Sequence, residues 1–138
     1  MGASKNVIPT EVGIQNIMKR ISYWLLPVFW AFAIFLMSSQ QGVSLPSFPY
    51  SDKIAHLCVY IVFGYLVMRA LVKGHSVGTY NGVILSLVIG TIYGFSDEVH
   101  QTFVPTRSAE FLDLFSDMVG SFIGALIFGY VANLSKKS

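Results

Sequence analysis

The feature that most constrains this chain is a set of four long stretches without a charged residue. They cover residues 21–51, 54–68, 75–96 and 118–135. A helix of about 20 mostly apolar residues, or as few as about 17, crosses the hydrocarbon core of a bilayer. The stretches therefore predict four transmembrane helices, centred on 21–37, 54–72, 79–96 and 117–134.

Composition argues against the alternative of a soluble all-α domain. Hydrophobic residues make up 54% of the 138 residues and charged residues only 12%, whereas soluble domains carry about 25% charged residues. A soluble helical domain needs a polar face on each helix, and the first and last apolar stretches have no charged face. We therefore predict an all-α membrane protein, a four-transmembrane-helix bundle, with no nucleic-acid partner.

The basic residues predict which ends of the helices face the cytoplasm. With the amino terminus inside, the inner side holds seven of the nine Lys and Arg residues: Lys5, Lys19, Arg20, Arg69, Lys73, Lys136 and Lys137. The outer side holds Lys53, Arg107 and six of the seven acids. Because short loops rich in Lys and Arg stay in the cytoplasm, we expect an N-in/C-in topology. The expected parts are a cytoplasmic polar or amphipathic head (1–20), a single transmembrane domain (21–134) and a basic cytoplasmic tail (135–138).

The amino-terminal region leaves two questions open. Ile14, Ile17 and Ile21 recur at helical spacing, so the head forms either a short interfacial helix or a disordered tail. The stretch 21–37 could also be a cleavable signal peptide, but its polar head is long and no small-x-small cleavage site follows it. We therefore predict a retained helix.

Small residues recur every four positions on the last two helices. They are Gly82, Ser86, Gly90 and Gly94 on the third helix, and Ser116, Gly120 and Gly124 on the fourth. Small residues at this spacing let transmembrane helices approach closely. We expect the third and fourth helices to form a tight hairpin, with chance glycine richness as the alternative.

Polar residues of the same helices share faces with these small residues. Asp113 and Asp117 continue the face of Gly120 and Gly124 at 100° per residue, and Asp97 falls on the small-residue side of the third helix. These acids are therefore expected to point into the bundle rather than towards lipid.

The second helix contributes its own polar face at the same outer level. Asp52, His56 and Tyr60 are spaced by four and lie on one side of that helix. We expect His56 to pair with Asp52 or Asp97, and Lys53 or Arg107 to pair with the acids of the third and fourth helices. Such pairs either bind a ligand or only hold the helices together; ionisable groups at membrane depth are more often functional.

Four segments resemble the VanZ-like family over most of residues 21–134. They are "SSQ" at 38–40, "DKIAHLCVY" at 52–60, "YGFSDEVHQTFVPTR" at 93–107 and "DLFSDMVGSFIG" at 113–124. The positions that match the family's motifs are Asp52, Lys53, His56, Tyr60, Asp97, Glu98, Gln101, Arg107 and Asp113. The sequence departs from the family pattern at Asp117, where Asn is usual. The resemblance implies a small bacterial membrane protein, related to one that gives low-level resistance to the lipoglycopeptide teicoplanin.

Three functions are compatible with these residues. The favoured one is a multi-pass protein of the bacterial cytoplasmic membrane whose extracytoplasmic polar cleft binds or moves a cell-envelope amphiphile, either a lipid head group or a lipoglycopeptide such as teicoplanin. Transport by so few helices would suit a homodimer. The second is a membrane-embedded enzyme in which carboxylates and a histidine act as acid and base on a lipid head group. The third is a structural partner subunit.

The candidate binding residues are the same for the first two functions. They are Asp52, Lys53, His56, Tyr60, Asp97, Glu98, His100, Gln101, Arg107, Asp113 and Asp117. No cofactor, no metal and no defined catalytic residue is expected, because neither motif has a known hydrolase or zincin spacing. As an alternative, six of the acidic and histidine side chains offer hard or borderline ligands for a divalent metal: His56, Asp97, Glu98, His100, Asp113 and Asp117.

Overall fold

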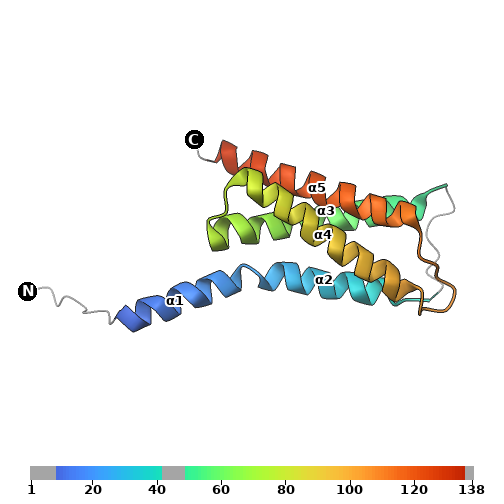
Figure 1. Ribbon diagram of the computed structural model, residues 1–138, viewed down its shortest axis with the longest axis horizontal. Coiled ribbons are helices and arrows are strands. Elements are labelled where there is room, and N and C mark those ends of the chain that lie inside the picture. Colours follow the sequence, from blue (N-terminus) through green and yellow to red (C-terminus); the bar gives the residue numbers. More distant parts are fainter. Residues whose placement is uncertain (1–8, 42–48, 136–138) are drawn as a thin grey trace, which may run out of the picture.

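The computed structural model describes residues 9–41 and 49–135 (Figure 1). Its regular elements there are all helical: α1 (Pro9–Ser22), α2 (Leu25–Ser38), α3 (Ser51–Arg69), a π-helical turn η1 (Ala70–Gly74), α4 (Thr79–Gln101) and α5 (Phe111–Leu134). Within the described residues, four helical stretches are long and apolar enough to cross a membrane: Thr10–Ser38, Ser51–Gly74, Thr79–Gln101 and Phe111–Leu134. The prediction of an all-α protein with four membrane-spanning helices is confirmed.

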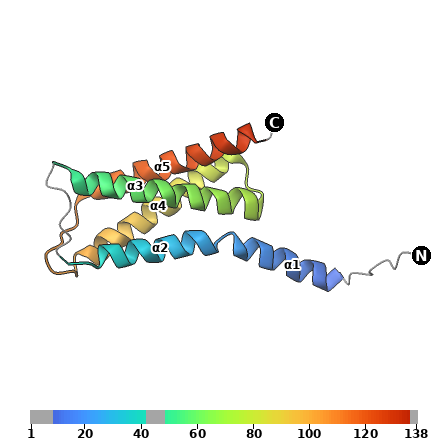
Figure 2. The same ribbon diagram turned by 180° about the vertical axis from the view of Figure 1, so that it is seen from behind.

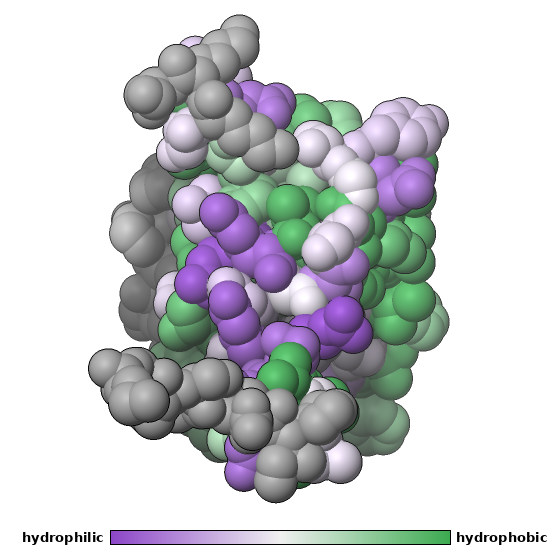
Figure 3. All heavy atoms as spheres, turned by 90° about the vertical axis from the view of Figure 1, so that its left-hand side faces the viewer, coloured by the Kyte–Doolittle hydropathy of each residue, from purple (hydrophilic) through white to green (hydrophobic). Residues whose placement is uncertain are grey.

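The two ends of the bundle differ in what they carry. α1, the turn between η1 and α4, and the end of α5 lie towards one end, and the connections from α2 to α3 and from α4 to α5 lie at the other (Figures 1 and 2). Viewed onto the first end, hydrophilic residues gather near the middle of the face and hydrophobic residues surround them (Figure 3). The helical turns that end here carry Lys19, Arg20, Arg69 and Lys73. The side of the membrane that this end faces stays a prediction.

Several helices extend beyond the apolar stretches that predicted them. α4 continues to Gln101 and α5 begins at Phe111, whereas the apolar cores were placed at 79–96 and 117–134. The added turns are polar, and many of their side chains bond to residues on other helices, as described below. A prediction from hydropathy places the end of a helix where the side chains become polar. The backbone hydrogen bonds of α4 and α5 continue through these polar turns.

The amino-terminal head is helical rather than disordered from Pro9 onwards. The residues of α1 from Thr10 onwards are exposed, and the helix projects away from the other helices (Figures 1 and 2). A turn at residues 23–24 separates it from α2. There Trp24 Nε1 donates a hydrogen bond to His75 Nε2 at 2.8 Å, and the Arg69 guanidinium lies 5.2 Å from the centre of the Tyr23 ring.

The core of the bundle is built around α3. Tyr60, Phe63 and Val67 pack with Ile34 of α2 and Leu71 of η1. On another side of α3, Met68 packs with Ala125 and Phe128 of α5. Large apolar side chains on the outer surfaces of the helices are exposed, among them Phe32, Ile92 and Phe122, as expected of surfaces that face lipid.

Glycines bring α3 and α5 into the closest backbone contact of the bundle. A Cβ added at Gly64 of α3 would overlap the backbone of Ser121, and one at Gly124 of α5 would overlap the carbonyl of Ile61. A Cβ at Gly120 would likewise lie 2.6 Å from the carbonyl oxygen of Leu57. Each substitution would force the helices apart, so these positions require glycine.

The expected hairpin of the last two spanning helices is only partly correct. α4 does meet α5 through small residues, since Gly90 contacts the Ser121 side chain and Gly94 contacts Asp117. The closest backbone contacts of α5, however, are with α3 and not with α4. The small-residue face of α5 is wide enough to serve two neighbours, and its sequence does not say which neighbour approaches more closely.

Candidate functional site

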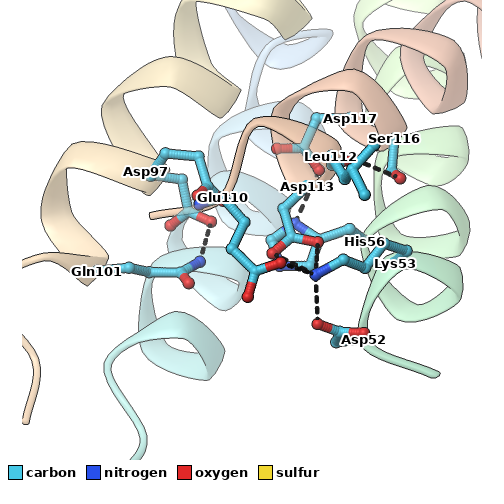
Figure 4. Close-up of polar contacts among 11 residues, drawn as sticks. Asp52, Lys53, His56, Asp97, Gln101, Glu110, Leu112, Asp113, Ser116 and Asp117 are labelled. Carbon is cyan, nitrogen blue, oxygen red and sulfur yellow. Dashed lines mark hydrogen bonds and ion pairs between the residues drawn. The ribbon is translucent and has the colours of Figure 1, made fainter. Parts of the chain in front are cut away.

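A histidine of α3 and an acid of α5 form the centre of the polar site. His56 Nδ1 lies 2.9 Å from Asp117 Oδ1, and the Asp117 side chain is fully buried (Figure 4). The His56 ring lies parallel to the Tyr60 ring, with centroids 6.5 Å apart. The expected partners of His56, Asp52 or Asp97, are therefore wrong. Because the small-residue face of α5 turns towards α3, it brings Asp117 opposite His56.

Lys53 is the positive centre of a second cluster (Figure 4). Its ammonium nitrogen lies 2.6 Å from Asp52 Oδ2 and 3.0 Å from Asp113 Oδ1, and it also bonds to Glu110. The Lys53 and Asp113 side chains are only 14% and 7% exposed, respectively. The expected pairing of Lys53 with an acid of the last helix is confirmed, and three carboxylates share one ammonium group.

Glu98 connects the end of α4 to the start of α5. One of its carboxylate oxygens, Oε2, accepts a hydrogen bond of 2.8 Å from the backbone N–H of Glu110, the residue before α5. Its other oxygen, Oε1, is buried and has no hydrogen-bond partner among the described residues. The same holds for Asp117 Oδ2. Two buried carboxylates are thus each held by one oxygen and have a second oxygen free.

Asp97 ties α2 to α4. Ser38 Oγ donates to Asp97 Oδ1 at 2.5 Å. Gln101 Nε2 donates to Asp97 Oδ2 at 3.2 Å (Figure 4). One turn away, Ser39 Oγ and His100 Nε2 are 2.9 Å apart. The serines of the "SSQ" segment therefore fix the carboxyl-terminal end of α2 against α4.

A pocket of about 300 Å³ lies between α2, α3 and α4 beside these groups. One part of its wall is apolar and includes Ile34, Met37, Ala55 and Val59. The other part is polar and includes Asp52, His56, Tyr60, Asp97, Gln101 and Arg107. Arg107 makes no ion pair within the described residues, so the pairing expected of Lys53 or Arg107 is made by Lys53. The exposed surface of the pocket is thus mostly apolar, and the residues that line it include polar groups of both charge signs.

The candidate binding residues fall into three groups in space. Six of the eleven line the pocket, as given above. Four lie outside its lining, in the two clusters of ionisable groups: Lys53, Glu98, Asp113 and Asp117. His100 stands apart with Ser39 and packs its ring against Phe35, 4.6 Å between centroids.

Sequence reasoning missed three kinds of site residue. Glu110 was noted as an acid but not placed in the site, although it bonds to Lys53. Ser38 belongs to the "SSQ" segment, one of the segments that resemble the family. Its hydrogen bond to Asp97, however, is visible only in the structure. The apolar wall, including Val59, gave no signal, because an apolar residue that lines a pocket resembles one that faces lipid.

Comparison with known proteins gives one finding. The family model described as VanZ/LLP1 matches residues 8–132, which is most of the chain. No curated protein and no solved structure matches the chain significantly.

Proposed function

Because the chain belongs to the VanZ/LLP1 family, we propose that it is a multi-pass protein of the bacterial cytoplasmic membrane that binds a cell-envelope amphiphile in the pocket between α2, α3 and α4. The observation that carries this proposal is the two-sided lining of the pocket, apolar along Ile34, Met37 and Val59 and polar at Asp97 and Arg107. The ligand is an anionic lipid head group or a lipoglycopeptide such as teicoplanin.

Each part of the lining suits one part of an amphiphile. The apolar wall receives an acyl chain. Because the surrounding lipid is as apolar as this wall, moving the chain into the pocket contributes little binding free energy. The polar contacts must therefore provide the specificity. Arg107 supplies a planar guanidinium that binds a phosphate or carboxylate through two parallel hydrogen bonds. Gln101 and Asp97 are bonded to each other at 3.2 Å and nearly buried, so they form a fixed part of the pocket wall near Arg107.

We place the pocket on the extracytoplasmic side of the membrane. The basic residues Lys19, Arg20, Arg69 and Lys73 lie at the opposite end of the helices, and such residues favour the cytoplasmic side. A pocket at the outer leaflet meets lipid-linked cell-wall intermediates and glycopeptides. A contribution to envelope function or to glycopeptide resistance follows from this position.

A tryptophan next to the pocket allows binding to be measured directly. Trp30 Nε1 donates to the Val59 carbonyl at 3.0 Å, and Val59 lines the pocket. In a Trp24→Phe background, Trp30 is the only tryptophan. The purified protein in detergent is titrated separately with phosphatidylglycerol and with teicoplanin, and we expect a saturable change in Trp30 fluorescence with at least one of them.

Two arginine variants test where the ligand binds. We expect Arg107→Ala to weaken binding about tenfold or more, since loss of a charge-assisted hydrogen bond costs roughly 1.5–3 kcal/mol. The matched control is Arg69→Ala. Arg69 lies in the last turn of α3 and is not among the residues that line the pocket. Both variants are also scored for abundance in the membrane. Equal affinity of the Arg107 variant and the parent protein, or loss of abundance without loss of affinity, would reject the proposal in favour of a structural role.

A specific contact favours enzymatic turnover as the second candidate. His56 lines the pocket while its Nδ1 contacts the buried Asp117, and a carboxylate that orients a histidine is an arrangement used in general base catalysis. Release of a soluble head group from phosphatidylglycerol by the parent protein, abolished in a His56→Ala variant that still binds the lipid, would favour this candidate. Binding without release would favour the first.

A further inference from the structure

Two clusters in the site each bring together three acidic or histidine side chains, and they differ in whether a lysine pairs with them. Asp52, Glu110 and Asp113 surround the ammonium group of Lys53, which bonds to all three. His56, Glu98 and Asp117 also bring ligand atoms within 4.8 Å of one another. No Lys or Arg pairs with Glu98 or Asp117 within the described residues. The first cluster has a permanent cation, whereas the second has only His56, which carries charge only when it is protonated.

The second cluster is also the more deeply buried. Glu98 is 5% exposed and Asp117 is fully buried. Burial of a carboxylate without a counter-charge is strongly unfavourable, and buried charges are usually paired or coordinate a metal. The neighbouring Asp113, one turn before Asp117 on the same face of α5, adds a further negative charge, and Lys53 already pairs with it. Among the described residues, only the His56 imidazole can supply positive charge beside Asp117, and it does so only when it is protonated.

Each carboxylate of the second cluster is positioned with one oxygen free. The Glu110 N–H holds Glu98 through Oε2, which leaves Oε1 without a partner among the described residues. His56 holds Asp117 through Oδ1, which leaves Oδ2 in the same state. Gly94 makes room for this arrangement, because a Cβ there would lie 2.8 Å from Asp117 Oδ2.

From these observations we propose that His56, Glu98 and Asp117 bind a divalent transition-metal ion. One imidazole nitrogen and two carboxylate oxygens form a mixed donor set that suits Zn²⁺ or Mn²⁺. Ligand atoms within 4.8 Å of one another reach metal–ligand distances of about 2.0–2.2 Å through small side-chain rotations. Three protein ligands leave at least one coordination position open.

The proposed metal site adjoins the pocket, so a ligand in the pocket could occupy the open coordination position. His56 belongs to both, since it lines the pocket and contacts Asp117. An ion held beside His56 offers an additional positive charge to an anionic group that enters next to it. The metal site does not depend on the proposed amphiphile, because the protein provides all three ligands itself.

The test measures metal binding to the full-length protein in detergent without lipid ligand. The protein is stripped with a chelator and dialysed, and Zn²⁺ and Mn²⁺ are titrated separately by calorimetry. We expect one ion per chain for at least one of them. Glu98→Gln and Asp117→Asn keep the size of each side chain, and we expect each to weaken binding at least tenfold. The matched control is Glu11→Gln in the exposed helix α1, outside both clusters, which should bind the ion with unchanged affinity.

A spectroscopic readout keeps the proposal testable if a variant is unstable. X-ray absorption of the Zn²⁺-loaded parent protein should show a first shell of nitrogen and oxygen atoms with imidazole scattering, and that imidazole signal should disappear in His56→Gln. No stoichiometric binding to the folded parent protein would overturn the proposal. Unchanged affinity in Glu98→Gln and Asp117→Asn, or an imidazole signal that persists in His56→Gln, would overturn it as well.

Discussion

The close contact between α3 and α5 allows us to predict how much Gly124→Ala lowers the free energy of unfolding. A Cβ at this position would lie 2.7 Å from Tyr65 N and 2.9 Å from the Ile61 carbonyl carbon, and it would overlap the carbonyl oxygen of Ile61. Ordinary contact begins at 3.4 Å, so the Tyr65 nitrogen alone requires a displacement of 0.7 Å (3.4 minus 2.7). All these atoms belong to the backbone of α3 and cannot rotate away.

The expected cost follows from that displacement. A gap of about 0.5–1 Å removes a quarter to a half of the dispersion attraction of the atoms along it, and overpacking of a well-packed core costs about 1–3 kcal/mol. We expect Gly124→Ala to lower the free energy of unfolding by about 2–3 kcal/mol, at the upper end of that range. Helix propensity opposes this loss slightly, since alanine is the better helix former.

Gly82→Ala is the matched control for this variant. Its added Cβ would lie 2.7 Å from Met68 Sδ and 3.0 Å from Met68 Cε, which are the end of a flexible side chain that adapts to irregular spaces. We expect a loss below about 1 kcal/mol. Both substitutions replace a helical glycine by alanine, so the difference between them reports packing rather than propensity.

The measurement is reversible unfolding in mixed micelles of mild detergent and sodium dodecyl sulfate, followed by circular dichroism. A loss for Gly124→Ala of less than about 0.5 kcal/mol, or equal losses for both variants, would refute the reasoning, because a backbone contact and a flexible side chain would then yield equally well.

The remaining predictions concern charge, hydrogen bonding and topology. Lys53→Met leaves the nearly buried Asp113 without its counter-charge and should lower the free energy of unfolding by about 3 kcal/mol; adding Asp113→Asn should restore part of it, and a double variant no more stable than the single one would contradict this. Trp30→Phe removes a side-chain hydrogen bond to the backbone of α3 and should lower the free energy of unfolding by about 1 kcal/mol in the same assay; an unchanged free energy of unfolding would contradict this. An alkaline phosphatase fused after Thr106 should be active, and one fused after Ser135 inactive; the reverse pattern would invert the proposed topology.

Much of the fold was predictable because each predictive signal is local. A charge-free stretch long enough to span a bilayer forms a helix there whatever its neighbours are, since every backbone polar group must be bonded within the segment. The faces were predictable for the same reason. Helical periodicity placed Asp113, Asp117, Gly120 and Gly124 together, and all four are buried.

The pairing of the polar residues was not predictable in the same way. The sequence predicted that His56 pairs with Asp52 or Asp97, and the fold instead pairs it with Asp117. Helical periodicity fixes which residues share a face, but not how far each helix turns about its axis or which neighbour that face meets. Packing between backbones decides this, through the overlap of α5 with α3 at Gly64 and Gly124.

The sequence by itself thus determined a four-span helical membrane protein with most of its acids towards one end and most of its Lys and Arg residues towards the other, because hydropathy, charge and helical period act along the chain. Only the tertiary structure decided that Lys53 pairs with all three acids of one cluster while Glu98 and Asp117 keep unpartnered oxygens beside His56. It also decided that the apolar wall of the pocket includes Ile34 and Val59. An apolar side chain has the same local signature against lipid, protein or a cavity, so only the arrangement of the helices distinguishes them.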